Sequence, residues 1–241
     1  MLWNNLKSEL QKMVYSRWIL LTAIGNLLLI SVLILTLAPL ANETGILLWQ
    51  SKLRQSFYLG QIGFVVITVL YFGQEYQRSA LRTSLLTLPR RTTFLMIKGI
   101  ALLIGTLLLF VVSFGISVLT LHFGLRVRIQ AADIVLFLCK LLPCFFCTIE
   151  LCFITAAITI LSRSIIVSFS IPIALILGLG SLLLQYGRIM RYLPILSVMN
   201  YFLPFVSSGY LLPIKGMLCQ SGWCIVLVFF AWRVFLGRHV R

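Results

Sequence analysis

Long apolar segments alternate with short polar ones along this chain. Each apolar segment has roughly 20 residues, the length of helix that crosses the ~30 Å hydrocarbon core of a bilayer. Strict alternation of polar and apolar residues, typical of barrel strands, does not occur in them. The pattern therefore predicts an all-α integral membrane protein with one domain over residues 1–241. Its six predicted transmembrane helices are Trp18–Ala38, Phe57–Gly73, Gly99–Leu121, Ile134–Leu161, Ile165–Leu184 and Met217–Leu236.

Residues 1–17 precede the first predicted span and have a different pattern. Apolar residues recur there at helical spacing, at Trp3, Leu6, Leu10 and Met13, with polar residues between them. Such spacing predicts an amphipathic helix that lies in the membrane interface. A simple membrane anchor is one interpretation of this helix, and a larger role remains open.

The segment 187–216, before the last predicted span, is too apolar for a solvated loop. Pro194, Pro204 and Pro213 interrupt it, and proline disrupts the interior of a helix. We expect a broken, re-entrant helical hairpin at the outer side of the membrane, shielded by protein where its backbone is unpaired. A seventh crossing is the alternative, but it would place the basic C-terminus outside, against the positive-inside rule.

Composition and charge support a membrane location. The 241 residues are 61% hydrophobic and 10% charged, and the net charge is +15. The cations cluster between the apolar segments, where they set topology and meet anionic headgroups, so nucleic acid is not an expected partner. With both termini in the cytoplasm, twelve of the twenty lysines and arginines lie on the inner side, as the positive-inside rule requires.

Residues 74–98, between the second and third predicted spans, are longer and more basic than a simple connection requires. Leu81, Leu85 and Leu88 belong to an apolar stripe at helical spacing, and Arg78 and Arg82 lie one turn apart on another face. Pro89 then ends that helix. The pattern predicts a cytoplasmic elbow that docks in a groove of another protein. A topogenic loop that lies on the headgroups is the alternative.

The order of residues in this elbow resembles the first cytoplasmic loop of ABC-2 type transporter permeases. Glu75 and the pair Leu81–Arg82 are followed by Leu85, Pro89, a basic corner and Lys98, which is similar to the family's pattern of E-x-x-x-G-T-L, L-L-x-x-P and a basic residue. Ser79 and Ala80 stand where the family usually has Gly-Thr. The amphipathic start, the six spans and the proline-broken segment extend the resemblance over nearly the whole chain.

The resemblance implies that the elbow is a coupling helix, seated in a cleft of a separate ATP-binding-cassette ATPase subunit. It assigns the polar contacts and the apolar anchors of that docking surface to Glu75, Arg78, Leu81, Arg82, Leu85, Arg90 and Arg91. The chain contains no G-x-x-x-x-G-K-[ST] motif. We therefore expect it to bind no cofactor and to be no enzyme itself, with ATP and Mg on the partner subunit.

Three polar residues inside the predicted spans are candidates for a translocation pathway. Glu150 lies near the middle of the fourth span, where an ionisable group is costly and must face protein or water. Asn26 and Gln61 lie in the first and second spans, with Gly60 and Gly63 allowing close helix approach. For Glu150 the alternative is a protonated carboxyl hydrogen-bonded between helices, and for Asn26 and Gln61 it is packing.

Neither a catalytic nor a metal site is predicted. Cys144 and Cys147 have redox-motif spacing but lie in an apolar run, where we expect them to be packing residues. His122 and His239 have no partners suited to metal binding or nucleophilic catalysis. A membrane-embedded enzyme or a secondary transporter that works without an ATPase remains the alternative class of function.

The resemblance implies a bacterial plasma-membrane exporter built from two permease chains, identical or homologous, and two ATPase chains. Short permeases with compact outer loops look like those of antimicrobial-peptide and lantibiotic immunity systems. An amphipathic peptide would then leave through an aromatic outer rim formed by Tyr192, Tyr201, Phe202 and Tyr210.

Overall fold

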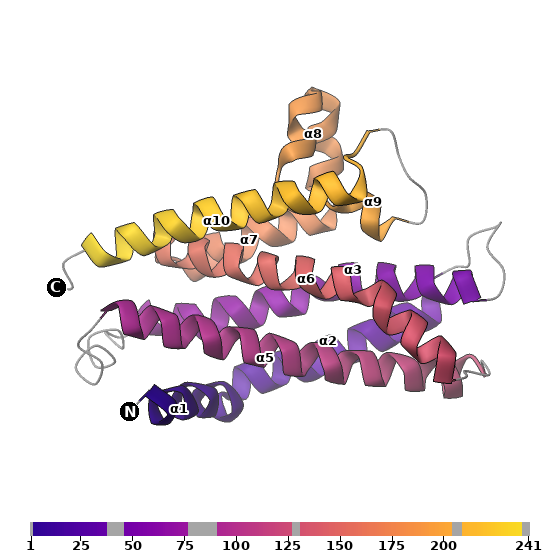
Figure 1. Ribbon diagram of the computed structural model, residues 1–241, viewed down its shortest axis with the longest axis horizontal. Helices are drawn as coiled ribbons and strands as arrows, with labels where there is room; N and C mark the ends of the chain where they lie inside the picture. The colour runs from indigo at the N-terminus through magenta and orange to yellow at the C-terminus, as the bar shows by residue number, and fades with distance from the viewer. Residues whose placement is uncertain (1, 38–45, 77–90, 127–130, 204–208, 238–241) are drawn as a thin grey trace.

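A computed structural model describes residues 2–37, 46–76, 91–126, 131–203 and 209–237. All regular structure in these ranges is helical (Figure 1). The elements are α1 (Leu2–Tyr15), α2 (Arg17–Thr36), α3 (Ile46–Gly73), η1 (Gln74–Tyr76), α5 (Arg91–Leu119), η2 (Thr120–Gly124), α6 (Ala131–Ser162), α7 (Ile165–Ala174), η3 (Leu175–Leu179), α8 (Gly180–Tyr186), η4 (Arg188–Tyr192), α9 (Met199–Phe202) and α10 (Pro213–Gly237).

Five of these helical segments are long and apolar enough to cross a membrane, namely Arg17–Thr36, Trp49–Tyr76, Arg91–Gly124, Asp133–Ser162 and Pro213–Gly237. They confirm an all-helical fold of the kind found in multi-pass membrane proteins, and they correspond to five of the six predicted spans. The helices lie side by side with their axes roughly along the long dimension of the molecule (Figure 1).

The remaining predicted span, Ile165–Leu184, is divided. Its α-helical part, α7, has ten residues, and a π turn, η3, leads from it into α8. Gly178 in that turn has a φ of 113°, which glycine adopts without the steric cost that a Cβ would add. Figure 1 shows α8 standing away from the bundle, so a sixth crossing stays a prediction.

The helices form a centre and a perimeter. In the most apolar 18-residue stretch of each long helix, 78% of the stretch is buried in α3 and 67% in α6. The buried share is 22% in α2, 28% in α5 and 17% in α10. α3 packs against α2 and α6, and α6 packs against α10. The perimeter helices expose apolar side chains such as Leu28, Leu108 and Ile225, a surface that suits lipid rather than water.

Small residues bring α2 and α3 together as the sequence predicts. A Cβ at Gly60 would lie 2.8 Å from Cδ1 of Ile30, and one at Gly63 would overlap the side chain of Asn26. Such distances are shorter than van der Waals contact, so both glycines are needed for this close approach. Asn26 is only 3% exposed.

The second long helix begins earlier than the hydropathy pattern predicts. α3 starts at Ile46 rather than Phe57, and its first turns contain buried polar residues, including Gln50, Ser51 and Lys52. Because these side chains are covered by protein, the helix can continue through a sequence that hydropathy alone assigns to a loop.

The segment before α10 lies against the bundle. Ile195, Leu196 and Val198 are each 2% exposed, and a guanidinium nitrogen of Arg54 donates a hydrogen bond to the carbonyl oxygen of Tyr201 at 3.3 Å. The described parts of 187–216 contain η4, a series of turns, α9 and the start of α10. That this segment re-enters the outer leaflet as a hairpin stays a prediction.

Candidate functional site

A cluster of four charged side chains and one tyrosine, hereafter the charge cluster, connects three helices at the end of the bundle where α1 begins and α10 ends (Figure 1). It consists of Glu9 and Lys12 from α1, Tyr71 from α3, Glu75 from η1 and Lys98 from α5. Residues 77–90, which include most of the predicted docking elbow, lie between η1 and α5 in the sequence.

Lys98 is the most deeply buried cation of this cluster. Its side chain is 2% exposed, and its Nζ lies 2.7 Å from Oε1 of Glu75. The ammonium group also donates to the carbonyl oxygen of Tyr71 at 3.4 Å and lies 4.5 Å from the centre of the Tyr71 ring. A buried ammonium needs such partners because removal from water is costly.

Glu9 joins α1 to the same network. Its Oε1 accepts a hydrogen bond from Lys12 at 2.6 Å, and its Oε2 accepts one from the hydroxyl of Tyr71 at 2.8 Å. Burial raises the pKa of the Glu9 carboxyl, but the ammonium groups of Lys98 and Lys12, with these hydrogen bonds, outweigh it and leave the pKa below its usual value. The ionised carboxylate is therefore the stable form at neutral pH.

The net charge of the cluster is zero, because two carboxylates face two ammonium groups. Lys12 is half exposed and lies 3.9 Å from Oε1 of Glu75. Gln74 adds a neutral contact, from its Nε2 to Oγ of Ser16 at 3.2 Å. The amphipathic N-terminal helix, the end of α3 and the start of α5 are thus held together by polar contacts.

The orientation of α1 differs in part from its predicted amphipathic pattern. Met13 is 8% exposed, and Leu6 and Leu10 pack against the core, whereas Trp3 is 74% exposed. The buried side of the helix therefore contains Glu9 as well as apolar residues. The outward side keeps apolar groups where an interfacial helix would meet lipid.

The predicted docking residues are only partly described. Arg78, Leu81, Arg82, Leu85 and Arg90 lie outside the described residues. Glu75 is 7% exposed and points toward Lys98, and Arg91 donates to the carbonyl oxygen of Leu236 at 3.2 Å. A contact of Glu75 or Arg91 with an ATPase subunit stays a prediction.

The three predicted pathway residues lie in three different helix interfaces. Asn26 faces Gly63 between α2 and α3, and Nε2 of Gln61 donates to Oγ1 of Thr148 at 3.3 Å between α3 and α6. Glu150 accepts a hydrogen bond from the hydroxyl of Ser221 between α6 and α10. The structure of the single chain therefore does not gather them around one space.

Several buried polar atoms near these residues have no hydrogen-bond partner within the described residues. They are Oε2 of Glu150, Oε1 of Gln220, and both polar atoms of the Asn26 amide. The bond between Glu150 and Ser221 is the contact that the packing interpretation requires. The second carboxyl oxygen is left to bind water or a polar group, and a pathway role for Glu150 stays a prediction.

The residues of the predicted outer rim differ in exposure. Tyr192 is 45% exposed, whereas Phe202 is 2% exposed, with its ring centre 5.2 Å from that of Tyr58. The hydroxyl of Tyr201 donates to the carbonyl oxygen of Lys140, and Tyr210 is half-buried. A role for these four residues in substrate exit stays a prediction.

Sequence reasoning did not predict the charge cluster. Lys98 was named only as the last residue of the pattern that resembles the permease family, and Glu9 was not singled out within the amphipathic helix. Only the acidic composition gave a signal: the chain has five Asp and Glu residues. Two of them, Glu9 and Glu75, fall within the predicted interfacial helix and the predicted elbow. No protein-family model matches the chain, and no curated protein matches it.

Proposed function

We propose that this chain is the membrane-spanning permease subunit of an ATP-binding-cassette exporter, energised by a separate ATPase subunit. The observation that carries the proposal is the charge cluster. It joins α1, the end of α3 and the start of α5 (Glu9, Tyr71, Glu75 and Lys98) on both sides of the sequence that resembles a coupling helix. Force applied to residues 77–90 would therefore act on three helices as one unit.

A rigid connection is what such a mechanism requires. If the elbow moved independently of the helices, closure of an ATPase dimer would displace the elbow alone and leave the membrane helices unchanged. In a buried ion pair of 2.7 Å, both partners lose much free energy on separation. The end of α3 and the start of α5 are therefore expected to move together.

The substrate that we propose is an amphipathic peptide, and the assembly has two permease chains with two ATPase chains. This assignment rests on the resemblance to antimicrobial-peptide immunity permeases. The exposed apolar side chains on α2, α5 and α10 support only the membrane location. A bacterial plasma membrane, with both termini in the cytoplasm, is the corresponding location.

The docking part of the proposal is tested by purification from the native membrane. We expect ATPase activity to purify with the wild-type chain and to be lost when Leu81 and Leu85 are both changed to Asp. The matched control is Leu212→Asp, since Leu212 is 56% exposed and directly precedes α10, outside the predicted elbow. Transport by the purified chain in vesicles without ATP or any ATPase would exclude the proposal.

The pathway part is tested with Glu150→Gln. This amide keeps an oxygen that accepts from Ser221 but cannot carry a negative charge. We expect slower ATP-driven peptide export while the ATPase still co-purifies. If export is unchanged, Glu150 is a packing residue and the pathway lies elsewhere.

A further inference from the structure

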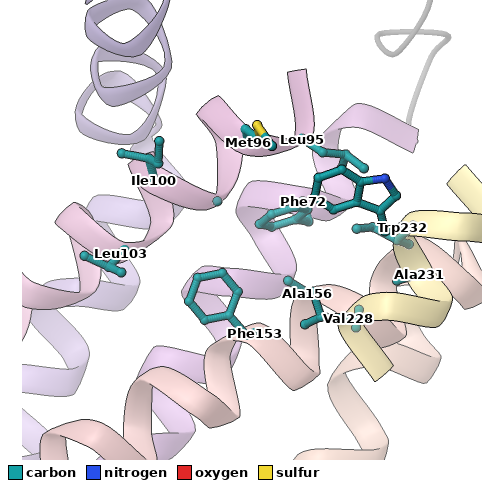
Figure 2. Close-up of a pocket in the computed structure, with 13 residues that line it drawn as sticks. Phe72, Leu95, Met96, Ile100, Leu103, Phe153, Ala156, Val228, Ala231 and Trp232 are labelled. Carbon is teal, nitrogen blue, oxygen red and sulfur yellow. The ribbon is translucent and has the colours of Figure 1, made fainter. Parts of the chain in front are cut away.

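An apolar groove lies between α5 and α10, beside the charge cluster but outside it. Its cavity is about 330 Å³, which falls in the lower range of ligand sites in proteins. Its lining is apolar and comes from α3, α5, α6 and α10, with Phe72, Leu95, Gly99, Phe153, Val228 and Trp232 among the residues that form it. Figure 2 shows the rings of Phe72, Phe153 and Trp232 around this space.

The groove faces outward from the bundle. Met96, Ile100 and Leu103 on its α5 side are 54%, 51% and 41% exposed, and α10 is the least buried of the five long helices. In a chain that crosses a bilayer, such a surface lies at the depth of the hydrocarbon. An acyl chain is therefore the chemistry that its walls suit.

Cations stand at one end of the groove. Arg91 precedes Leu95 by one turn of α5, and its guanidinium bridges to α10 through the carbonyl oxygen of Leu236. Arg233 follows Trp232 in α10 and lines a second, neighbouring pocket. Trp232 lines both this pocket and the groove. Neither α5 nor α10 contains an acidic residue, and the carboxylates of the charge cluster face Lys98 and Lys12. Arg233 therefore adds a positive charge at this end of the groove that suits an anionic headgroup.

We propose that the groove binds one phospholipid with an anionic headgroup, its acyl chain against Phe153 and Trp232 and its phosphate near Arg233 and Arg91. Basic pockets between transmembrane helices on the cytoplasmic side bind such headgroups, and tryptophan is favoured at the level of the headgroups. By the positive-inside rule this end of the bundle is the cytoplasmic one. The assignment does not depend on the exporter function.

The test measures quenching of Trp232 fluorescence by phospholipids with brominated acyl chains. The chain has five tryptophans, so the contribution of Trp232 is the difference between wild type and Trp232→Phe. Two vesicle series are compared: brominated phosphatidylglycerol in ordinary phosphatidylcholine, and brominated phosphatidylcholine in ordinary phosphatidylglycerol. We expect the first series to quench Trp232 at a several-fold lower mole fraction.

Two variants assign that preference to the groove. Gly99→Leu fills it, because a Cβ at Gly99 would lie 3.7 Å from Cε1 of Phe153, at ordinary contact distance. The same change at Gly115, which has no atom within 4 Å of a Cβ, is the control on α5. We expect Gly99→Leu to remove the headgroup preference and Gly115→Leu to keep it.

Arg233→Gln should reduce the preference for phosphatidylglycerol by about fivefold while Trp232 remains quenched. Lys215→Gln, at the exposed start of α10, removes the same charge without this effect. Equal quenching by both headgroups in the wild type would refute the proposal. The proposal would also be refuted if neither lipid quenched Trp232, because protein, such as a second copy of the chain, would then cover the groove.

Discussion

The ion pair between Lys98 and Glu75 allows a quantitative test of the charge cluster. At the observed 2.7 Å, two unit charges attract by about 6 kcal/mol at an effective dielectric constant of 20. The cost of removing both groups from water offsets most of this gain, so the net contribution of the pair is small. Removing one partner leaves the other buried without its counter-ion.

We therefore expect Glu75→Gln and Lys98→Met each to lower the free energy of unfolding by about 3 kcal/mol. After Glu75→Gln, Lys98 keeps its hydrogen bond to the Tyr71 carbonyl and its contact with the Tyr71 ring. The loss of stability should therefore lie at the lower end of the range usual for breaking a buried ion pair. After Lys98→Met, the two carboxylates share only Lys12, which is half exposed.

The double variant is the decisive measurement. Because it removes both charges together, we expect it to cost less than either single change, well below the additive sum of about 6 kcal/mol. The assay is reversible unfolding of the purified chain in detergent, followed by circular dichroism. Lys215→Met, at an exposed lysine, controls for the substitution and should change stability by less than about 0.5 kcal/mol. Additive costs would show that the two groups do not interact.

Two further predictions concern neighbouring contacts. Gly63→Ala should lower the free energy of unfolding by about 1 to 3 kcal/mol in the same assay, because its Cβ would overlap Asn26. Gly25→Ala is the control and should not destabilise, since no atom lies within 4 Å of a Cβ there. Equal effects of the two changes would contradict the packing of α2 on α3. The pKa of Glu9 in the folded chain is lower than its ordinary value of 4.5. The Glu9 carboxylate therefore contributes its full stabilisation above pH 4.5 and loses it as the pH falls through the folded pKa. The stability of Glu9→Gln should therefore fall less than that of the wild type between pH 5 and pH 3, and parallel curves would show that Glu9 is not held as a carboxylate by the cluster.

Hydropathy predicts the helices of this fold well because it reflects a property of each segment alone. A run such as that in α2 or α5 must be helical at bilayer depth to satisfy its own backbone. The close approach of α2 and α3 was also predicted, since glycine is the one residue type without a Cβ, and Gly60 and Gly63 lie about one turn apart in the same predicted span. In each case the signal lies within one helix.

Features that depend on contacts between helices were not predicted. The early start of α3 depends on protein that covers Gln50 and Lys52, and the sequence does not show that cover. The division of the predicted span Ile165–Leu184 arises at Gly178, one of sixteen glycines in the chain. The charge cluster joins residues as far apart as Glu9 and Tyr71, which no local pattern associates.

A buried charge cluster is a costly way to stabilise three helices, since an apolar core of the same volume would hold them at least as well. What ion pairs add is a unique arrangement: Lys98 can satisfy its charge only where Glu75 and the Tyr71 carbonyl meet it, whereas leucines could slide past one another. Helices that must move as one unit need that fixed arrangement more than additional stability. Under the proposed exporter function, the cluster beside the sequence 77–90 would therefore serve to transmit motion as well as to hold the fold.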